Sequence, residues 1–125
     1  MEYTQISFEE FSKVEIKVGR IIAAEKIEGS EKLIKLQIDF GTHVSTGLPH
    51  VRTILSGVVK TYSPDQMIGK QVPVVMNLAP RMIMGVESQG MVLFAIDETL
   101  LEGLPSHKTI MIHPEVVVPL NSAVQ

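Results

Sequence analysis

Residues 63–69 read Ser-Pro-Asp-Gln-Met-Ile-Gly, and this short stretch decides the fold. Ser63 is a good N-cap, and the proline after it suits the first helical position. Gln66, three residues after the cap, completes a capping box, and Gly69 ends the helix. The stretch therefore predicts a helix of about one and a half turns. What lies on either side of so short a helix determines the architecture.

Three β-strands are predicted before this helix. Residues 14–21 alternate between apolar and polar side chains, and the alternation slips at Gly19, which predicts a β-bulge that lets the strand curl. The same alternation predicts strands at 34–40 and 53–59. Between these two, residues 41–50 are rich in turn formers and are expected to form a loop.

Two more strands are predicted after the helix, at 71–76 and 91–96, with a loop at 77–89 between them. The strand at 91–96 is apolar on both sides and is expected to be central. Three strands, a short helix and two strands is the element order of an OB-fold. We therefore predict an all-β, five-stranded OB-fold barrel at about 13–97, followed by a C-terminal extension at about 98–125, in a single domain.

Both ends of the chain carry further elements. Ser7 and Glu10 form a capping box, which predicts a short N-terminal helix whose Phe8 and Phe11 pack inward. In the extension, residues 109–112 and 116–118 are short apolar segments with β-strand character. A closed barrel has no other use for these side chains, so we expect them to contact a second copy of the chain.

The composition excludes several classes of protein. The 125 residues include no cysteine, which rules out disulfides, thiolate metal sites and cysteine nucleophiles. The N-terminus lacks the basic and apolar segments of a secretory signal. Every apolar run is shorter than the ~20 residues that cross a membrane. We expect a cytoplasmic protein without a membrane segment.

The distribution of charge matters more than the net charge of −3. Residues 13–81 contain ten of the eleven lysines and arginines but only six of the fourteen acidic residues, which gives a net charge of +4. The flanking segments are acidic. An acidic total therefore conceals a mildly basic central region, which is the region predicted to form the barrel.

The loops that bind ligands in OB-folds contain several candidate binding residues. Such folds use the face of strands 2 and 3 together with the loops between strands 1 and 2 and between strands 4 and 5. Lys32 and Lys35 belong to the first loop and the strand after it, and Arg81 lies in the second loop among apolar residues. Asn77 and Ser88 add uncharged hydrogen-bonding groups. Cations of this kind suit phosphates, and the amide and hydroxyl suit base edges or ribose.

Catalytic and metal-binding interpretations find little support. His43 and His50 lie seven residues apart in the predicted 41–50 loop, without a carboxylate at ligand spacing. No nucleophile elbow or phosphate-binding glycine loop is present. We expect no catalytic residue, no metal and no cofactor.

Three stretches resemble a known family. They read Phe-Ser-Lys-Val-Glu-Ile-Lys-Val-Gly-Arg-Ile at 11–21, Ser-Gly-Val-Val-Lys-Thr-Tyr-Ser-Pro at 56–64, and Asn-Leu-Ala-Pro-Arg-Met-Ile-Met-Gly-Val-Glu-Ser-Gln-Gly-Met at 77–91. Over roughly residues 8–118 the chain resembles the tRNA-binding domain that occurs as a free-standing dimeric protein and as part of methionyl-tRNA synthetases. The resemblance implies tRNA binding by a homodimer, with contacts from Ser56, Asn77, Arg81 and Ser88 and with Lys60 as a helper.

Two alternatives remain open at this point. Family members usually carry a second basic residue after the Pro-Arg pair, where this chain has Met82. A related branch of the fold is a dimeric export-associated chaperone that binds peptides, and methionines such as Met82 and Met84 would suit such contacts, although methionines more often fill a core. The chain would otherwise be a dimerisation appendage of a separate synthetase.

Overall fold

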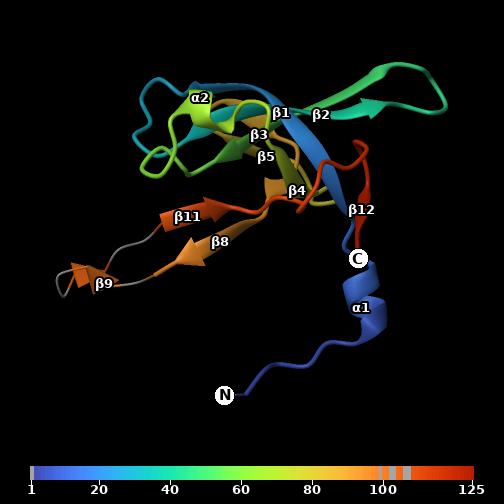
Figure 1. Ribbon diagram of the computed structural model, residues 1–125, viewed down its shortest axis with the longest axis horizontal. Helices are drawn as coiled ribbons and strands as arrows, with labels where there is room; N and C mark the ends of the chain where they lie inside the picture. The colour runs from blue at the N-terminus through green and yellow to red at the C-terminus, as the bar shows by residue number, and fades with distance from the viewer. Residues whose placement is uncertain (1, 99, 102–103, 106–107) are drawn as a thin grey trace.

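A curled antiparallel sheet forms the body of the molecule (Figure 1). The computed structural model describes residues 2–98, 100–101, 104–105 and 108–125. The strands follow the order β3-β2-β1-β4-β7 across the sheet. Their bounds are β1 (Ile16–Lys26), β2 (Ile34–Thr42), β3 (Pro49–Ser56), β4 (Gln71–Val75) and β7 (Met91–Val92). This is the strand order of an OB-fold, so the predicted fold class is confirmed.

Contacts between β3 and the residues before β7 bring the two ends of the sheet together. The Gln89 N–H donates to the Thr53 carbonyl at 2.8 Å, and the Thr53 N–H donates to Gln89 Oε1 at 2.9 Å. Nearby, the Leu55 N–H donates to Ser88 Oγ at 3.1 Å. We call residues 88–90, together with β3, the closing seam. Side chains complete the seam where a regular strand ladder is absent.

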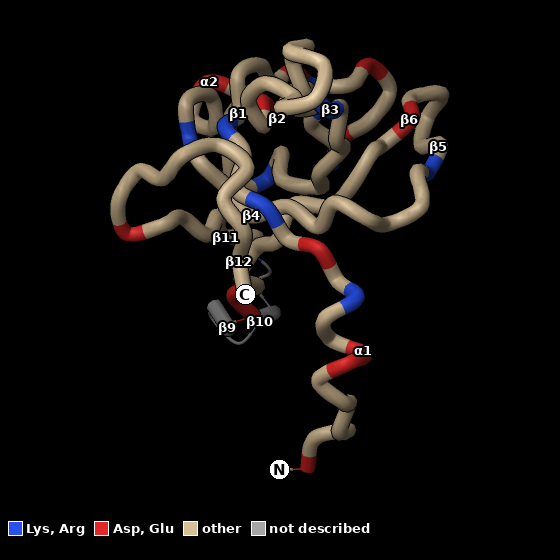
Figure 2. Tube along the Cα trace, turned by 90° about the vertical axis from the view of Figure 1, so that its right-hand side faces the viewer, with Lys and Arg blue, Asp and Glu red and all other residues tan. Residues whose placement is uncertain are grey.

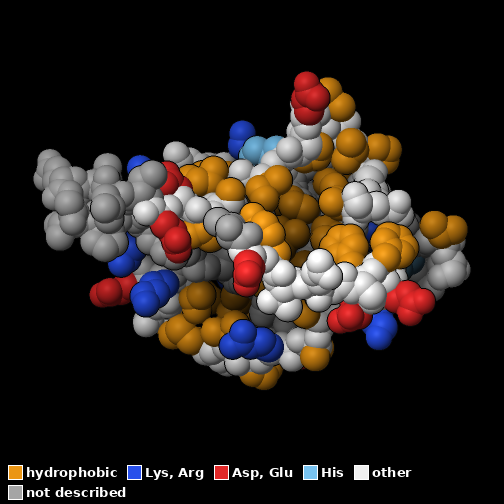
Figure 3. Space-filling model, turned by 90° about the horizontal axis from the view of Figure 1, so that it is seen from below, with side chains coloured by type: hydrophobic (Ala, Val, Ile, Leu, Met, Phe, Trp, Pro, Cys, Tyr) orange, Lys and Arg blue, Asp and Glu red, His pale blue; other side chains and the backbone are white. Residues whose placement is uncertain are grey.

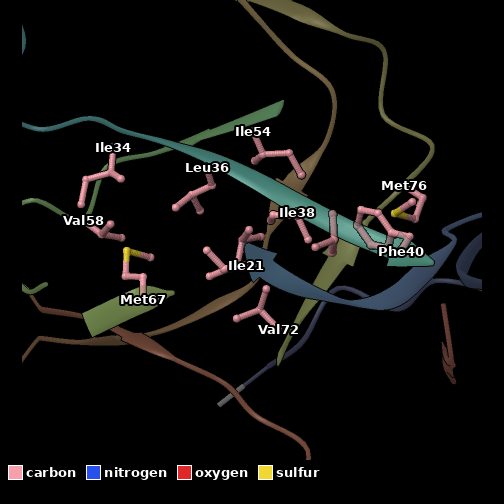
Figure 4. Close-up of a cluster of buried hydrophobic side chains, with 12 residues drawn as sticks. Ile21, Ile34, Leu36, Ile38, Phe40, Ile54, Val58, Met67, Val72 and Met76 are labelled. Atoms are coloured by element: carbon pink, nitrogen blue, oxygen red, sulfur yellow. The ribbon is translucent and has the colours of Figure 1, made fainter. Parts of the chain in front are cut away.

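The short helix predicted from residues 63–69 is present as α2 (Pro64–Met67). Its capping box is formed, with the Ser63 N–H donating to Gln66 Oε1 at 2.8 Å. Met67 is completely buried and belongs to the core cluster, which also contains Met76 and Val58 besides branched and aromatic residues of β1 to β4 and β7 (Figure 4). The helix therefore packs against one end of the barrel through a single large side chain.

Gly19 has a different role from the one predicted. The pairing of β1 with β2 shifts between Ile21 and Ala23, so the bulge lies two or more residues beyond the predicted position. A Cβ on Gly19 would lie 2.5 Å from Ile38 Cγ2 and 2.7 Å from Phe40 Cε1. The glycine is required because β1 and the side chains of β2 approach one another more closely than any side chain would allow.

Three strand predictions need correction. β2 and β3 extend into the predicted 41–50 loop, which shortens it to residues 43–48, and β3 ends at Ser56 rather than at residue 59. The predicted strand 91–96 is interrupted at Leu93, whose N–H donates to the Pro73 carbonyl at 3.0 Å. Its second half, β8 (Phe94–Asp97), leaves the sheet and pairs with β11 (Lys108–Met111). The expectation of a central strand is wrong there, because Ile96 is exposed.

Further short strands lie outside the main path of the sheet. The predicted 77–89 loop contains a hairpin of β5 (Arg81–Ile83) and β6 (Val86–Ser88). β9 (Leu100–Leu101) pairs with β10 (Leu104–Pro105), and β12 (Ala123–Val124) pairs with the start of β1. The segment 109–112 largely coincides with β11, whereas 116–118 is not a strand.

The N-terminal helix forms but does not pack as expected. α1 (Phe8–Ser12) has its capping box, and it extends away from the barrel beyond the start of β1 (Figures 1 and 2). Phe8 is 82% exposed and Phe11 is 45% exposed. The prediction that both side chains pack inward against the barrel of the same chain is therefore wrong. In the described parts of the chain, no helix has the length and apolar character needed to cross a membrane.

Replacing Gly19 with alanine should destabilise the barrel by about 1–3 kcal/mol, because the added methyl group overlaps Ile38 and Phe40. Urea denaturation followed by circular dichroism would measure the free energy of unfolding. Gly57→Ala is the matched control, since a Cβ at Gly57 meets no atom within 4 Å. Equal stabilities of the two variants would contradict the proposed close approach.

Candidate nucleic-acid interface

Two of the predicted lysines line the same pocket. Lys32 and Lys60 border a cavity of about 300 Å³ together with Gly57, Thr61 and Thr109. The Val59 N–H donates to the Lys32 carbonyl at 3.2 Å, which fixes the segment after β3 against the β1–β2 loop. Both lysine side chains are exposed. The pocket therefore presents two ammonium groups from segments far apart in the sequence, an arrangement suited to a phosphate oxygen.

Lys35 is less available than these two lysines. Its Nζ lies 2.7 Å from Glu25 Oε1 across the β1–β2 ladder, where the two residues are cross-strand partners. Because both side chains reach solvent, this ion pair is worth about 0–1 kcal/mol and does not lock the lysine in place. A phosphate could bind Lys35 only by breaking the ion pair between Lys35 and Glu25.

Arg81 lies on β5, at an edge of the molecule well separated from α2 (Figure 2). Its side chain is exposed, and no ion pair to it occurs within the described residues. The turn of the β5–β6 hairpin reaches the β1–β2 loop, since a Cβ on Gly29 would lie 3.6 Å from the Met84 methyl group. The two loops expected to bind ligand are therefore neighbours, and Arg81 lies at the base of the hairpin, paired with Ser88.

The uncharged candidates use their polar groups within the protein. Asn77 Oδ1 accepts from the Glu15 N–H at 2.9 Å, and Asn77 Nδ2 donates to the Lys13 carbonyl at 2.5 Å. Ser88, only 6% exposed, accepts from the Leu55 N–H and donates to the Gly90 carbonyl at 3.4 Å. Ser56 is buried at the end of β3. Asn77 and Ser88 therefore hold the loops in position, and the side chains of Lys32, Lys60 and Arg81 are exposed.

Arg52 is a structural cation that the sequence analysis did not identify. Its Nη1 donates to the Met76 carbonyl at 2.5 Å and to the Gln89 carbonyl at 3.0 Å, so the side chain joins β3 to the end of β4 and to the closing seam. The only signal in the sequence was an arginine within an apolar strand pattern. Through these two bonds of Nη1, Arg52 positions the base of the β5–β6 hairpin.

The histidines form an aromatic stack on the β2–β3 hairpin. The His43 and His50 ring centroids are 4.3 Å apart in stacked geometry, and His50 lies 5.3 Å from Phe40. Burial lowers the pKa of His50, and the nearby charges of His43 and Arg52 lower it further. Arg52 Nε lies 3.3 Å from His50 Nε2, a contact that suits the neutral ring. No group of three metal-ligating side chains occurs within the described residues.

The methionines divide between the core and the surface. Met67 and Met76 are buried, but Met82 and Met84 on the β5–β6 hairpin are 67% and 53% exposed. The view that the methionines mainly fill the core is therefore wrong for this hairpin. Exposed methionines beside Arg81 provide an adaptable apolar surface next to a cation.

This is an OB-type barrel with exposed cations near adjoining loops, and neutral polar side chains hold those loops in place. Such an arrangement is typical of modules that bind nucleic acid. The family model described as "Putative tRNA binding domain" matches residues 16–120. The chain therefore belongs to this tRNA-binding domain family.

The relatives and solved structures agree with that assignment. The chain is 47% identical over 93 residues to a methionine–tRNA ligase of Caldanaerobacter subterraneus, a match covering 74% of this chain and 14% of that protein. It is 41% identical over 119 residues to the ligase of Flavobacterium johnsoniae, covering 95% and 15% of the two chains. The chain thus spans a small part of the length of these relatives.

Among solved structures, a MetRS-related protein from Pyrococcus horikoshii is similar with a TM-score of 0.80 and 36% identity, covering 98% of this chain and 100% of that chain. The chaperone CsaA from Bacillus anthracis has a TM-score of 0.77 at 24% identity, covering 98% and 100%. The second likeness concerns the fold alone.

Ser88→Ala should lower the free energy of unfolding by about 1–3 kcal/mol, because the Leu55 N–H at the closing seam loses its acceptor. Thermal and urea denaturation would measure the loss. Ser45→Ala, at an exposed position in the 43–48 turn, is the control and should change stability by less than about 0.5 kcal/mol. A Ser88→Ala variant as stable as the parent protein, but weaker in RNA binding, would restore Ser88 as a direct contact.

Proposed function

We propose that this chain binds tRNA, without covalent chemistry, through the Lys32–Lys60 pocket and the outer side of the β5–β6 hairpin. The observation that carries the proposal is the convergence of Lys32 and Lys60 on one cavity, in a chain that belongs to a tRNA-binding family. Phosphate recognition supplies most of the affinity in such complexes. Lys35 contributes when it leaves Glu25.

The arrangement suits a folded RNA better than an extended strand. The proposed surface has two positions, the Lys32–Lys60 pocket and Arg81 on the β5–β6 hairpin. The turn of this hairpin touches the β1–β2 loop. A bent RNA can place two backbone segments against these two positions at once. The guanidinium of Arg81 can hold a phosphate or a guanine edge bidentately, whereas the lysines act as point charges. Met82 and Met84, exposed beside Arg81, can contact the face of an unpaired base.

Replacing both pocket lysines, as Lys32→Gln with Lys60→Gln, should weaken tRNA binding and reduce the slope of log affinity against log salt by about one unit for each lost phosphate contact. Arg81→Ala should cost about 1–3 kcal/mol of binding free energy with the fold intact. Binding measured by fluorescence anisotropy across a salt series tests both. Lys13→Gln, an exposed lysine away from the pocket, is the control.

Unchanged affinity and salt slope in the pocket variants would contradict the proposed surface. Loss of binding in the Lys13 control as well would point to non-specific charge attraction.

A second candidate function, peptide binding, is favoured by the exposure of Met82 and Met84. An unfolded polypeptide added as competitor distinguishes the two, because tRNA binding through lysines should ignore it and peptide binding should not.

We further propose that the protein is a homodimer through the face that carries α1 and β12. A five-residue helix is too short to be stable alone, yet α1 exposes two phenylalanines. With Val14, Ile16 and Val124 they line a cavity of about 410 Å³. Figure 3, which views the molecule of Figure 1 from below, shows hydrophobic side chains gathered on that face. A second copy would cover this surface and place two RNA-binding faces in one assembly.

Sedimentation equilibrium should give twice the chain mass of 13.8 kDa. Phe8→Ser combined with Phe11→Ser should shift the protein to monomer while the barrel stays folded, since neither residue belongs to the core. Val44→Ser, at an exposed position on the β2–β3 hairpin, is the control and should leave the dimer intact. A parent protein that is monomeric at micromolar concentration would refute the dimer but not the RNA-binding surface.

The partnership with a synthetase remains part of the proposal. The relatives that match are methionine–tRNA ligases of which this chain covers a small part. A domain of this kind raises the local concentration of tRNA near a catalytic body, whether it is linked to that body or associates with it. The predicted cytoplasmic location stays a prediction.

A further inference from the structure

A second group of cations lies outside the proposed RNA-binding surface. Arg20 on β1, Lys70 after α2 and His113 in the C-terminal segment line a cavity of about 280 Å³, together with Gly69, Gln71, Pro114 and Val117. No carboxylate lines this cavity. None of the three cationic residues belongs to the surface assigned to tRNA above.

The floor of the cavity is fixed by hydrogen bonds. The Gln71 amide donates to the Val118 carbonyl at 2.7 Å, and its Oε1 accepts from the Val118 N–H at 3.0 Å. The Val18 carbonyl accepts from the Asn121 N–H at 2.8 Å. These bonds fix the C-terminal segment across β1 and β4, above Arg20. The cavity is therefore a built feature of the fold and not a gap beside a loose tail.

Arg20 supplies the observation that points to a ligand. Its Nε is buried and is the one buried side-chain nitrogen or oxygen, among the described residues, that has no hydrogen-bond partner. Asp39 is the cross-strand neighbour of Arg20, but Asp39 Oδ1 accepts from the Gly41 N–H at 2.8 Å, and no ion pair joins Asp39 to Arg20. A buried guanidinium N–H without an acceptor is costly, and Arg20 also lines the cavity, so an anion bound there would lie beside a cation that no ion pair within the described residues neutralises.

His113 can take part in the same contact. Its Nδ1 lies 2.7 Å from the Gln71 carbonyl, and a carbonyl only accepts, so Nδ1 carries a proton. Nε2 is then the nitrogen left for a ligand, and it can donate to an anion only when the ring is fully protonated. Lys70, which is exposed, also lines the cavity.

The size of the cavity limits the ligand. Pockets that enclose whole small molecules are usually larger, at about 300–1,000 Å³. A tetrahedral oxyanion fits a smaller space and can accept hydrogen bonds from several donors at once. A second cavity of about 580 Å³, lined by Tyr62 and Asp65 among others, shares Lys70 and His113 and leaves room for whatever the anion is attached to.

We propose that Arg20, Lys70 and His113 form a phosphate-binding site that is separate from the tRNA surface. The phosphate belongs either to an RNA backbone or to a free phosphate or small phosphate ester, and the chemistry of recognition is the same. The site does not rest on the proposed tRNA-binding function.

The direct probe is the NMR resonance of the Arg20 Nε–Hε group. Titration with inorganic phosphate at constant ionic strength should shift this resonance saturably, together with the amides of residues 69–71 and 113, whereas chloride should not. Lys70→Gln combined with His113→Gln should weaken the binding about tenfold, because two of the three charged contacts are lost. Lys13→Gln is the control and should leave it unchanged.

The source of the phosphate is decided by a second titration with tRNA. If tRNA produces the same shifts and Lys70→Gln lowers its salt slope, the site holds an RNA phosphate; if only inorganic phosphate does so, the site serves a small ligand. The proposal is overturned if neither phosphate nor tRNA moves the Arg20 resonance saturably, or if the Lys70–His113 variant binds phosphate as tightly as the parent. Either result leaves the test of the Lys32–Lys60 pocket unaffected.

Discussion

The closing seam is the constraint on which the rest of the structure depends. A curled sheet leaves edge groups without partners unless its two ends meet, and here they meet where β3 faces residues 88–90. Side chains complete the hydrogen bonds, with Gln89 and Ser88 serving the backbone of β3. Gly90 has no side chain because a Cβ there would lie 2.9 Å from the Val75 carbonyl.

The demands of closure explain which polar residues remain for binding. Arg52, Asn77 and Ser88 all have the chemistry of RNA contacts, yet each has its donors or acceptors occupied by backbone groups near the seam or at the start of β1. Leaving those backbone groups without hydrogen-bond partners would destabilise the fold by more free energy than a surface contact to RNA would contribute to binding. In the proposed interface, recognition therefore rests on exposed cations near the loops, chiefly Lys32, Lys60 and Arg81.

The proposed RNA-binding cations and the exposed phenylalanines lie on different parts of this small barrel. Lysines and arginines border two cavities, one between the β1–β2 loop and the segment after β3 and one beneath the C-terminal segment. Exposed phenylalanines and the C-terminal strand gather on another face. If both proposals hold, the two surfaces would not compete, and the clustering of cations gives a chain with a net charge of −3 a local basic surface.

The sequence by itself determined the order of the elements and the class of the fold, because capping residues and period-two alternation act within a few neighbours. The helix at α2 was predicted from Ser63, Pro64, Gln66 and Gly69, and Lys32, Lys60 and Arg81 are exposed, although Arg81 lies on a strand and not in a loop. Tertiary structure alone decided what long-range packing controls. It engaged the side chain of Asn77 with the backbone of residues 13 and 15, buried Ser88, left Phe8 exposed, shifted the bulge beyond Gly19, and brought Arg20, Lys70 and His113 to one cavity. These residues are far apart in the chain, and which of them meet depends on how the sheet curls and closes, a property that no local pattern carries.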